Sequence, residues 1–521
     1  MKFIELLTGN LVSRRVAETG LLKYSRRRVK KLDEMKVPEV QQETLLRLVS
    51  YASGTLFARD HRFHEINSIE TFQKNVPVRE YEFFWDRYWK DAYPRLEGLT
   101  WPDKIPYYAL SSGTTSGSTK YIPISHQMIA SNKKAAFTLL SFFKNAYPES
   151  RIFNGKVFFL SGNTDMKELA DGSRAGDLSA VAAREVWQGI RPYTFPPMEL
   201  ARIPDWETKV QKLAEAAARE PITAISGVPS WILFLFDRLK KVTGKNTIAD
   251  IWPLLRLVIH GGTRFDPYRE LFQKEIGSDQ VQFVDTYPSS EGYIATEDPR
   301  YKLLRVIPDC EIFYEFIPFD ELGKDNPTRH TLATVETGVN YAVVLTSCAG
   351  MWANLLGDTV VFEKRDPPLL RFSGRTKYFL SAFGEHLISE EIEKAIAEAA
   401  RQTDAVYSDF HVGPIFSTDP SEPGTHRYLI EFRRKPKDMN SFIKIFDDYL
   451  KNINEDYEAH RKNNLTMRLP VVDIVKENGF LEWMLAHGKR PPQHKVPRMD
   501  NTGKLTESMR SWFSSHQWLD Q

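Results

Sequence analysis

Cysteine is scarce in this sequence of 521 residues, which contains only Cys310 and Cys348. Two cysteines cannot build a disulfide framework, and these two lack the spacing of metal ligands. We therefore expect reduced, buried thiols in a cytoplasmic protein. Long apolar segments are missing too: no run of 18 or more apolar residues is present, so no membrane span is expected. Charges are scattered through residues 1–20, which argues against a signal peptide.

An excess of charge of one sign is also absent. The 70 lysine and arginine residues are balanced by 68 aspartate and glutamate residues, which leaves a formal charge of +2. No overall field would attract nucleic acid or an anionic membrane, and we expect neither as a partner. A basic cluster does lie between Arg14 and Lys31. A solvated helix face explains it more simply than a helix that contacts phosphates or a membrane, but the pattern allows both.

The composition is that of a folded globular protein, with 42% hydrophobic and 26% charged residues. Residues up to about 75 have a helical pattern. From Tyr107 onward, short β-rich runs alternate with helix-sized stretches, which is typical of α/β proteins. The predicted strands lie at 156–162, 222–230, 255–262 and 280–288, and the predicted helices include 206–220 and 229–242.

The chain is longer than the usual size of one hydrophobic core, so at least two domains are expected. Residues 303–348 resemble consecutive strands and predict a β-rich subdomain. A small α+β pattern begins near Lys377, with helices at 389–401 and 440–462, strands through 428–434 and at 469–475, and a last helix. We therefore expect an α/β fold with a large N-terminal domain (1–376) and a small α+β C-terminal domain (377–521). No low-complexity linker is present, so a short hinge joins them.

The sharpest local signal is the segment 111–125, SSGTTSGSTKYIPIS. Glycines let backbone amides converge on an anion, while hydroxyls and the ammonium of Lys120 donate to phosphate oxygens. The spacing is not that of a Walker A loop. A polar surface turn is the alternative, but so dense a set of hydroxyls before a lysine favours phosphate binding. The candidate phosphate ligands are Ser111, Ser112, Gly113, Thr114, Thr115, Gly117 and Lys120.

This segment resembles the phosphate-binding loop of the adenylate-forming superfamily of acyl-CoA synthetases, adenylation domains and luciferase. More closely, the chain resembles a bacterial-type member of the Gretchen Hagen acyl acid amido synthetases, the auxin- and jasmonate-conjugating family. The likeness covers nearly the whole chain, because several motifs follow in the family's order. They are 42–66, 71–84, the phosphate loop, 286–295 (TYPSSEGYIA), 354–361 (NLLGDTVV) and 374–396.

The resemblance implies roles for the residues around TYPSSE. Thr286 and Tyr287 are expected to contact the nucleotide, with the aromatic ring beside adenine, and Ser290 to touch the α-phosphate. Glu291 is expected to help bind Mg²⁺, which prefers carboxylate and phosphate oxygens. Taken alone, a loop glutamate is more often a solvated acid; the complete set of motifs favours the metal role.

Two further motifs complete the implied nucleotide site. His260, Gly261 and Gly262 end a predicted strand, and their glycines allow the close approach of a flat ligand. The resemblance implies an adenine wall, although a simple strand-to-helix turn explains His260 equally well. Asp358 matches the aspartate that accepts hydrogen bonds from both ribose hydroxyls. The plant pattern Y-R-x-G-D is replaced here by NLLGD, so plant substrate preferences do not transfer.

Arg375 and Lys377 match the superfamily's arginine and hinge residue, which implies that the C-terminal domain is mobile and turns between two half-reactions. The alternative is that Arg375 is a surface charge and Lys377 a loop residue without a role in catalysis. Lys504 is the candidate catalytic lysine, steering the attacking carboxylate onto the α-phosphorus. Its spacing from Pro497 is one residue longer than the usual pattern, and amido synthetases often lack a clear counterpart, so a structural role is equally open.

The predicted function is therefore ATP- and Mg²⁺-dependent adenylation of a small carboxylic acid, followed by transfer of the acyl group to the amine of an amino acid. The acid is expected to be aromatic or aliphatic, because Trp231 and Leu235 could line an apolar slot, although a core helix explains them slightly better. Two alternatives stay open: an acyl-CoA ligase that forms a thioester, and a nucleotide-binding regulator without catalysis. The sequence leaves the oligomeric state undetermined.

Overall fold

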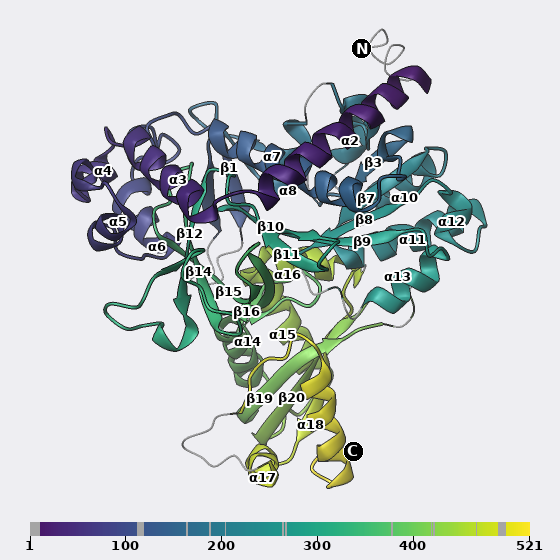
Figure 1. Ribbon diagram of the computed structural model, residues 1–521. Helices are drawn as coiled ribbons and strands as arrows, with labels where there is room; N and C mark the ends of the chain where they lie inside the picture. Colours follow the sequence, from purple (N-terminus) through teal and green to yellow (C-terminus); the bar gives the residue numbers. More distant parts are fainter. Residues whose placement is uncertain are drawn as a thin grey trace.

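The computed structural model describes residues 11–520, apart from 112–118, 163–164, 187–188, 204, 263–264, 266–267, 377–378, 418, 420–421, 465 and 488–495. The segment before residue 75 is helical, as its sequence pattern predicted. In α3, Leu45, Leu48 and Val49 lie on the buried face. Ser68 and Thr71 close a capping box at the start of α5. These first helices (Figure 1) are α2 (Leu11–Asp33), α3 (Val37–Tyr51), α4 (Leu56–Asp60), α5 (Ile69–Asn75) and α6 (Tyr81–Phe84).

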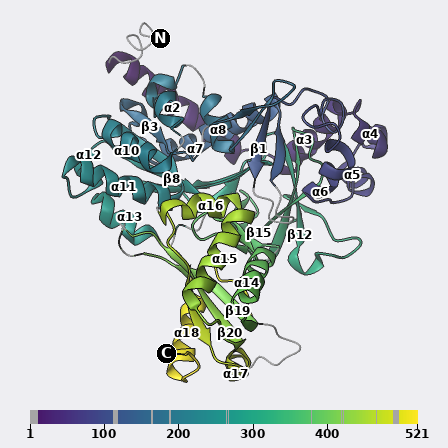
Figure 2. The same ribbon diagram turned by 180° about the vertical axis from the view of Figure 1, so that it is seen from behind.

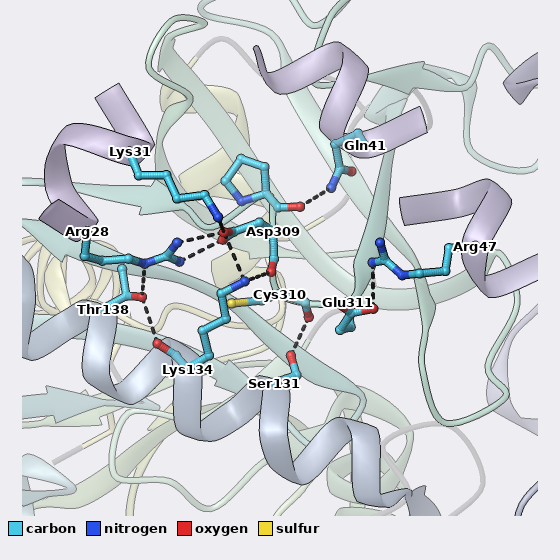
Figure 3. A network of polar contacts seen from close by, with 11 residues as sticks. Arg28, Lys31, Gln41, Arg47, Ser131, Lys134, Thr138, Asp309, Cys310 and Glu311 are labelled. Atoms are coloured by element: carbon cyan, nitrogen blue, oxygen red, sulfur yellow. Dashed lines mark hydrogen bonds and ion pairs between the residues drawn. The ribbon is translucent and has the colours of Figure 1, made fainter. Parts of the chain in front are cut away.

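A network of charges holds α2 against the body of the protein (Figure 3). The Arg28 guanidinium donates two hydrogen bonds of 2.7 Å to the Asp309 carboxylate and one of 3.0 Å to the Thr138 hydroxyl. Lys31 and Lys134 also reach Asp309, with N–O distances of 3.5 and 3.0 Å. Although burial opposes the effect, Arg28 and Lys134 hold the pKa of Asp309 well below its usual range.

The basic cluster of α2 is therefore only partly a solvated face. The two arginines that precede Arg28 are exposed, as expected, but Arg28 itself is 5% exposed and works as an internal anchor. Helix α3 supplies a second anchor, because the Gln41 amide donates to the carbonyl oxygens of Pro308 and Ile312 at 2.7 and 2.9 Å. Together the two helices fix the loop that precedes strand β12 (Ile312–Pro318).

Twelve strands of the described chain form one mixed sheet in the order β13-β12-β14-β15-β16-β11-β10-β9-β8-β7-β3-β6. Strands β6, β3, β7, β8 and β9 run parallel, and every pairing beyond β9 is antiparallel. The four predicted strands are confirmed as β3, β7, β8 and β9, and the predicted β-rich segment continues the same sheet. The strands are β3 (Lys156–Phe159), β6 (Thr194–Phe195), β7 (Ile222–Gly227), β8 (Leu257–Gly261), β9 (Gln282–Ser289), β10 (Gly292–Asp298), β11 (Leu303–Val306), β12, β13 (His330–Thr331), β14 (Asn340–Ser347), β15 (Asn354–Lys364) and β16 (Leu369–Arg375).

Helices pack beside the parallel half of this sheet (Figures 1 and 2). Helix α11 begins with Pro229, whose fixed φ suits a first turn, and is capped after Thr243 by Gly244, whose φ of +69° favours glycine. Its apolar face joins the main hydrophobic core. The helices between β2 and β9 are α7 (His126–Ala146), α8 (Leu178–Arg184), α9 (Met198–Ala201), α10 (Trp206–Ala217), α11 (Pro229–Thr243), α12 (Ile248–Ile251) and α13 (Arg269–Ile276).

A separate four-stranded sheet has the order β2-β1-β5-β4. Strands β1 and β2 are antiparallel, and β1 and β5 are parallel, with Ala109 opposite Gly176. The hydroxyl-rich segment connects two strands of this sheet, since β1 ends at Ser111 and β2 begins at Lys120. Its strands are β1 (Tyr107–Ser111), β2 (Lys120–Ile124), β4 (Lys167–Glu168) and β5 (Arg174–Gly176).

The C-terminal segment projects from the larger body (Figures 1 and 2). The helix predicted over 440–462 is two helices, because Asn454 is extended and its side chain accepts the Tyr457 backbone N–H to cap the second. A three-stranded sheet, β19-β20-β21, lies beside these helices. The elements are β17 (Phe379–Leu380), β18 (Leu387–Ile388), α14 (Ser389–Gln402), β19 (Val406–Ile415), β20 (Thr425–Arg434), α15 (Met439–Ile453), α16 (Glu455–Arg461), β21 (Val471–Val475), α17 (Gly479–Ala486) and α18 (Lys504–Ser515).

Both cysteines are buried and free, as predicted. Burial of the Cys310 thiol raises its pKa to about 12, which makes it a poor nucleophile. Within the described ranges, none of the helices combines the length and apolar character that crossing a membrane requires.

Candidate active site

The hydroxyl- and glycine-rich segment itself, with Ser112, Gly113, Thr114, Thr115 and Gly117, lies outside the described residues. Its two flanks are described. Ser111 ends β1 and Lys120 begins β2, and the two lie directly opposite each other in the antiparallel pair. The segment therefore starts and finishes at one point of the four-stranded sheet, with the Lys120 side chain at that point.

Lys120 is held against α6. Its Nζ lies 2.8 Å from Glu82 Oε1 and 5.0 Å from the centre of the Tyr81 ring. The Tyr81 hydroxyl accepts the backbone N–H of Tyr121 at 2.9 Å, which fixes the ring. Only 12% of the Lys120 side chain is exposed. The ammonium is thus positioned by an ion pair and a cation–π contact, and no local sequence signal could have identified Glu82 as its partner.

Glu291 lies at the tip of the hairpin between β9 and β10. Ser290 and Glu291 form its two-residue turn, with Ser289 opposite Gly292. The Ser289 hydroxyl and the Gly292 backbone exchange hydrogen bonds of 3.0 and 3.2 Å. Burial raises the pKa of Glu291, the Lys120 ammonium opposes this rise, and the Asp358 carboxylate adds to it. Lys120 and Asp358, from distant parts of the sequence, therefore lie close enough to Glu291 for their charges to change its pKa.

Asp358 connects three strands of the large sheet. It lies opposite Arg375 on β16, and its Oδ1 is 2.6 Å from Arg375 Nε. Its Oδ2 accepts the Tyr287 hydroxyl of β9 at 2.8 Å. Burial, together with the Asp358 charge, raises the pKa of Tyr287 well above its usual value, so the phenol stays a donor. A carboxylate has about four acceptor sites, so these two contacts leave capacity for ligand hydroxyls.

His260, Gly261 and Gly262 lie where β8 ends, beside Thr286 of β9. A side chain on Gly261 would come within 2.5 Å of the Thr286 carbonyl oxygen, so only glycine fits there. Gly262 has a φ of +80°. The His260 ring is buried and stacks on Phe265 at 3.8 Å, and its Nδ1 lies 3.4 Å from Asp285 Oδ1. The parallel strands β8 and β9 thus present their carboxyl ends together, the usual ligand-binding edge of an α/β sheet.

The C-terminal segment contacts this side of the larger body. The Thr119 hydroxyl, next to Lys120, donates to Glu455 Oε1 of α16 at 3.3 Å. His460 of the same helix stacks on Trp231 of α11, with ring centres 5.7 Å apart. Leu235, the other residue expected in an acid slot, is fully buried in the core, so the core-helix alternative holds for it. Trp231 is half-buried at the junction with α16.

Lys209 of α10 is a buried residue that sequence reasoning missed. Its side chain is only 2% exposed, and its Nζ donates to the Gly162 carbonyl oxygen. Burial lowers its pKa to about 8, while the Asp165 and Asp177 carboxylates oppose that change. Helical spacing was the signal that could have identified it. Lys209 lies four positions before Leu213 of the apolar core, so both residues share one face of α10.

Arg375 and Lys504 occupy different parts of the molecule. Arg375 lies beside Asp358 on the large sheet, whereas Lys504 begins α18 and is exposed, and it forms no ion pair with a described residue. Its own turn packs near β19, since a side chain on Gly503 would come within 2.6 Å of the Pro414 carbonyl oxygen. Lys377, the expected hinge residue, lies outside the described residues.

The described site therefore combines one fixed cation, one carboxylate with a raised pKa and a second carboxylate that accepts hydroxyl donors. The charges of Lys120 and Asp358 both act on Glu291, which follows the carboxyl end of β9. This arrangement suits a ligand with phosphates at one end and hydroxyls at the other.

Three family models match the sequence: the GH3 family N-terminal domain over residues 28–210, the central domain over 305–375 and the C-terminal domain over 390–504. A jasmonoyl–L-amino acid synthetase of Nicotiana attenuata is 22% identical, over 88% of this chain and 90% of that protein. Two solved structures share the fold. The acyl acid amido synthetase AtGH3.15, in complex with 2,4-DB, has a TM-score of 0.62 at 17% identity and covers 96% of both chains. A 2-hydroxyisobutyryl-CoA ligase has a TM-score of 0.56 at 14% identity, over 92% of this chain and 94% of that one.

Proposed function

Because the chain belongs to the GH3 family, we propose that it uses ATP to activate a carboxylic acid as its acyl-adenylate and transfers the acyl group to the amine of an amino acid. The observation that carries this proposal is that the charges of Lys120 and Asp358 both act on Glu291, which follows the carboxyl end of β9 at the ligand-binding edge of the sheet. The Nicotiana relative is named for joining a jasmonoyl group to an L-amino acid, which supports an amide as the product.

In the first half-reaction, a carboxylate oxygen attacks the α-phosphorus and pyrophosphate leaves with the bonding electron pair. The protein has little covalent chemistry to supply, because alignment and charge neutralisation lower the barrier. Lys120 stabilises negative charge on the phosphates, and Asp358 accepts the ribose hydroxyls. His260, Gly261, Thr286 and Tyr287 form the wall at the base, and Ser290 contacts the α-phosphate. The hydroxyl-rich segment that begins at Ser111 binds the remaining phosphates.

Mg²⁺ fits this site as a companion of the triphosphate. Within the described ranges, no group of three or more histidine, cysteine, aspartate or glutamate residues is arranged to hold a metal alone. Mg²⁺ is commonly bound by one or two carboxylates together with substrate phosphates, and Glu291 is such a carboxylate. The ion would supply charge neutralisation on the phosphates. Glu291, whose pKa is raised by burial, gains from a nearby cation.

In the second half-reaction, the neutral amine attacks the acyl carbonyl, its nitrogen loses a proton, and AMP leaves with the electron pair of the broken anhydride bond. The reference pKa of an α-amine is near 8, so part of it is neutral at cellular pH. Lys504 is exposed on α18, and it can act in adenylation only if the C-terminal domain turns. We therefore propose that a mobile domain beginning at residue 377 alternates between the two half-reactions in the cytoplasm.

The test is a mass-spectrometric screen of carboxylic acids and amino acids with ATP and Mg²⁺, with coenzyme A as a parallel acceptor. The expected products are AMP, pyrophosphate and a condensed amide. If turnover occurred only with coenzyme A, the protein would be a thioester-forming ligase and not an amide-forming one. The absence of AMP under every condition would contradict the proposal.

A further inference from the structure

The face of α2 that meets solvent is strongly basic. The buried residues of α2 follow one another three or four positions apart, so one side of the helix packs on the protein and the other is exposed. The exposed acids nearby, Asp33 and Glu34, lie at the end of α2 and just after it. We define the basic face of α2 by its exposed cations, which are Arg15, Lys23, Arg26, Arg27, Lys30 and Lys31.

Most of the charge on this basic face is not neutralised by neighbouring acids. Lys30 and Lys31 reach Glu34 and Asp309 only at N–O distances of 3.7 and 3.5 Å. The other four cations of the face form no ion pair with any residue that the structure describes. Arg28, in contrast, points inward to Asp309 (Figure 3). Like charges along one helix repel one another, and an anionic partner would relieve that repulsion.

Apolar groups lie among these charges. Val16 is 67% exposed and Tyr24 is 44% exposed. Val16 lies seven positions before Lys23, and Tyr24 seven before Lys31, so both belong to the basic face. Membrane interfaces combine anionic headgroups with acyl chains, and tyrosine is enriched at the level of the headgroups. The mixture of cations and apolar groups therefore matches a lipid surface.

An open hollow of about 540 Å³ between α2 and α3 adds to this face. Four cations and one acid line it, together with two apolar side chains: Arg27, Lys30, Lys31, Lys36, Glu34, Met35 and Val40. Lysine and arginine side chains donate charge-assisted hydrogen bonds to phosphate oxygens, while the apolar side chains suit the carbon atoms of a lipid. The hollow has the chemistry to receive a phospholipid headgroup.

The position of α2 leaves room for an extended partner. Figures 1 and 2 show α2 at the end of the larger body that is opposite the C-terminal segment. With 23 residues, α2 is about 35 Å long at roughly 1.5 Å per residue, so its basic face is a line and not a compact pocket. A flat surface can contact this line without obstructing the C-terminal segment.

We propose that the basic face of α2 docks the protein onto a membrane surface rich in anionic phospholipids. Their phosphates pair with the exposed lysines and arginines, and Val16 and Tyr24 lie among the headgroups. Nucleic acid would pair with the same cations but gain nothing from an exposed valine, so the face favours a bilayer. The nearly balanced total charge predicted no such partner. Salt screens charges beyond about 8 Å, however, so the local excess on α2 decides the binding.

Flotation of the full chain with vesicles tests the docking, and titration with lipid gives the affinity. The protein is expected to float with an equal mixture of phosphatidylglycerol and phosphatidylcholine, and to stay behind with phosphatidylcholine alone. Rising salt should release it. A triple variant, Lys23→Gln, Arg26→Gln and Arg27→Gln, is expected to bind the mixed vesicles about 100-fold more weakly, since each basic residue near such a surface contributes about fivefold.

A matched control removes the same charge elsewhere. Arg433→Gln, Arg434→Gln and Lys437→Gln change three exposed positions at and just after the end of β20, and this protein should bind the mixed vesicles like wild type. Glutamine forms helices nearly as well as lysine and arginine, so α2 should keep its structure in the first variant. Equal urea midpoints of the two variants would confirm this.

The absence of a preference for the mixed vesicles would overturn the inference, as would unchanged binding by the variant of α2. Release from mixed vesicles by inorganic phosphate at constant ionic strength would assign the hollow to free phosphate and contradict membrane docking. Tighter binding to a duplex oligonucleotide than to the mixed vesicles would do the same. These measurements need no turnover, so their outcome is independent of the proposed function.

Discussion

Asp358 and Arg375 face each other across neighbouring strands and form an ion pair of 2.6 Å between Oδ1 and Nε. The pair lies at the end of β16, two residues before the expected hinge at Lys377. Tyr287 donates to the other oxygen of the same carboxylate. One buried group thus connects β9, β15 and β16 at the place where we propose that ribose binds.

Asp358→Asn is expected to weaken ATP binding by at least tenfold. The substitution keeps the shape of the side chain but removes a charged acceptor, which is worth about 1–3 kcal/mol when a partner is left unpaired, or roughly tenfold per 1.4 kcal/mol. Calorimetric titration with ATP measures the change. Asp404→Asn is the control, because its 2.8 Å pair with Arg434 is more than half exposed. Unchanged ATP affinity in the Asp358 variant would remove its ribose role.

The raised pKa of Glu291 predicts that Mg²⁺ binding depends on pH. Its pKa is raised above the ordinary 4.5 by burial, so protonation begins at a higher pH than for an exposed glutamate. A protonated carboxyl cannot bind the cation, so the apparent affinity for Mg²⁺ should fall as the pH falls toward the raised pKa. Mg²⁺ activation curves between about pH 5 and 8 test this, given the usual range of carboxyl shifts. The Glu291→Gln protein should bind Mg²⁺ weakly and show no such slope; a wild-type slope in the opposite sense would be incompatible with metal binding at Glu291.

Lys120→Ala is expected to slow adenylation by about 100-fold, the usual effect of losing one preorganised donor to developing charge. Pyrophosphate exchange at saturating ATP measures the rate. Lys156→Ala is a matched control, because Lys156 also forms a 2.8 Å ion pair, with Glu220, but lies at the amino end of β3, whereas the site lies at the carboxyl ends of the parallel strands. If both variants lost the same fraction of activity, the loss in Lys120→Ala would reflect the removal of an ion pair and not a role of Lys120 in adenylation.

Lys504→Ala separates the half-reactions. If the C-terminal domain turns to bring this lysine to the α-phosphate, acyl-adenylate formation should fall at least tenfold, while a preformed acyl-adenylate still yields amide at the normal rate. Rapid quenching of single turnovers resolves the two steps. Lys444→Ala, at an exposed position of α15, is the control. Unchanged acyl-adenylate formation would exclude Lys504 from catalysis.

Arg28→Ala is expected to destabilise the protein by about 1–3 kcal/mol, the usual cost of losing buried hydrogen bonds to a charged group, because Lys31 and Lys134 still pair with Asp309. The neighbouring Arg26→Ala, at an exposed position, should change little. Urea midpoints compare the two. Because the pKa of Asp309 is depressed in the folded protein, its contribution is complete above the ordinary value of 3.8 and is lost as the pH falls below it. The difference between wild type and Arg28→Ala should therefore shrink in acid; a constant difference would speak against this pair.

The regular elements of the fold could be predicted because they follow local patterns. Short β-rich runs predicted β3, β7, β8 and β9, and the helical pattern up to about residue 75 predicted the first helices, α3 among them. The break at Asn454 was missed, because its cap depends on a backbone conformation that the helical pattern around it conceals.

The candidate site was predictable only where residues follow one another in a motif. Glu291 and Asp358 belong to such motifs, and the structure brings them into one electrostatic environment with Lys120. The contacts of Lys120 with Glu82 and of His460 with Trp231 join residues far apart in sequence. No local pattern encodes such pairings, since they arise from packing of whole elements.

We propose that the site places a carboxylic acid in line with the α-phosphorus of ATP. Exchange of labelled pyrophosphate into ATP tests it most directly, since the exchange requires reversible formation of an acyl-adenylate and needs no acceptor amine. Label is expected to enter ATP only when a suitable carboxylic acid is present, and Lys120→Ala is expected to slow this exchange. Failure of every acid in a broad panel to promote exchange, or release of ADP and phosphate in place of AMP, would contradict it.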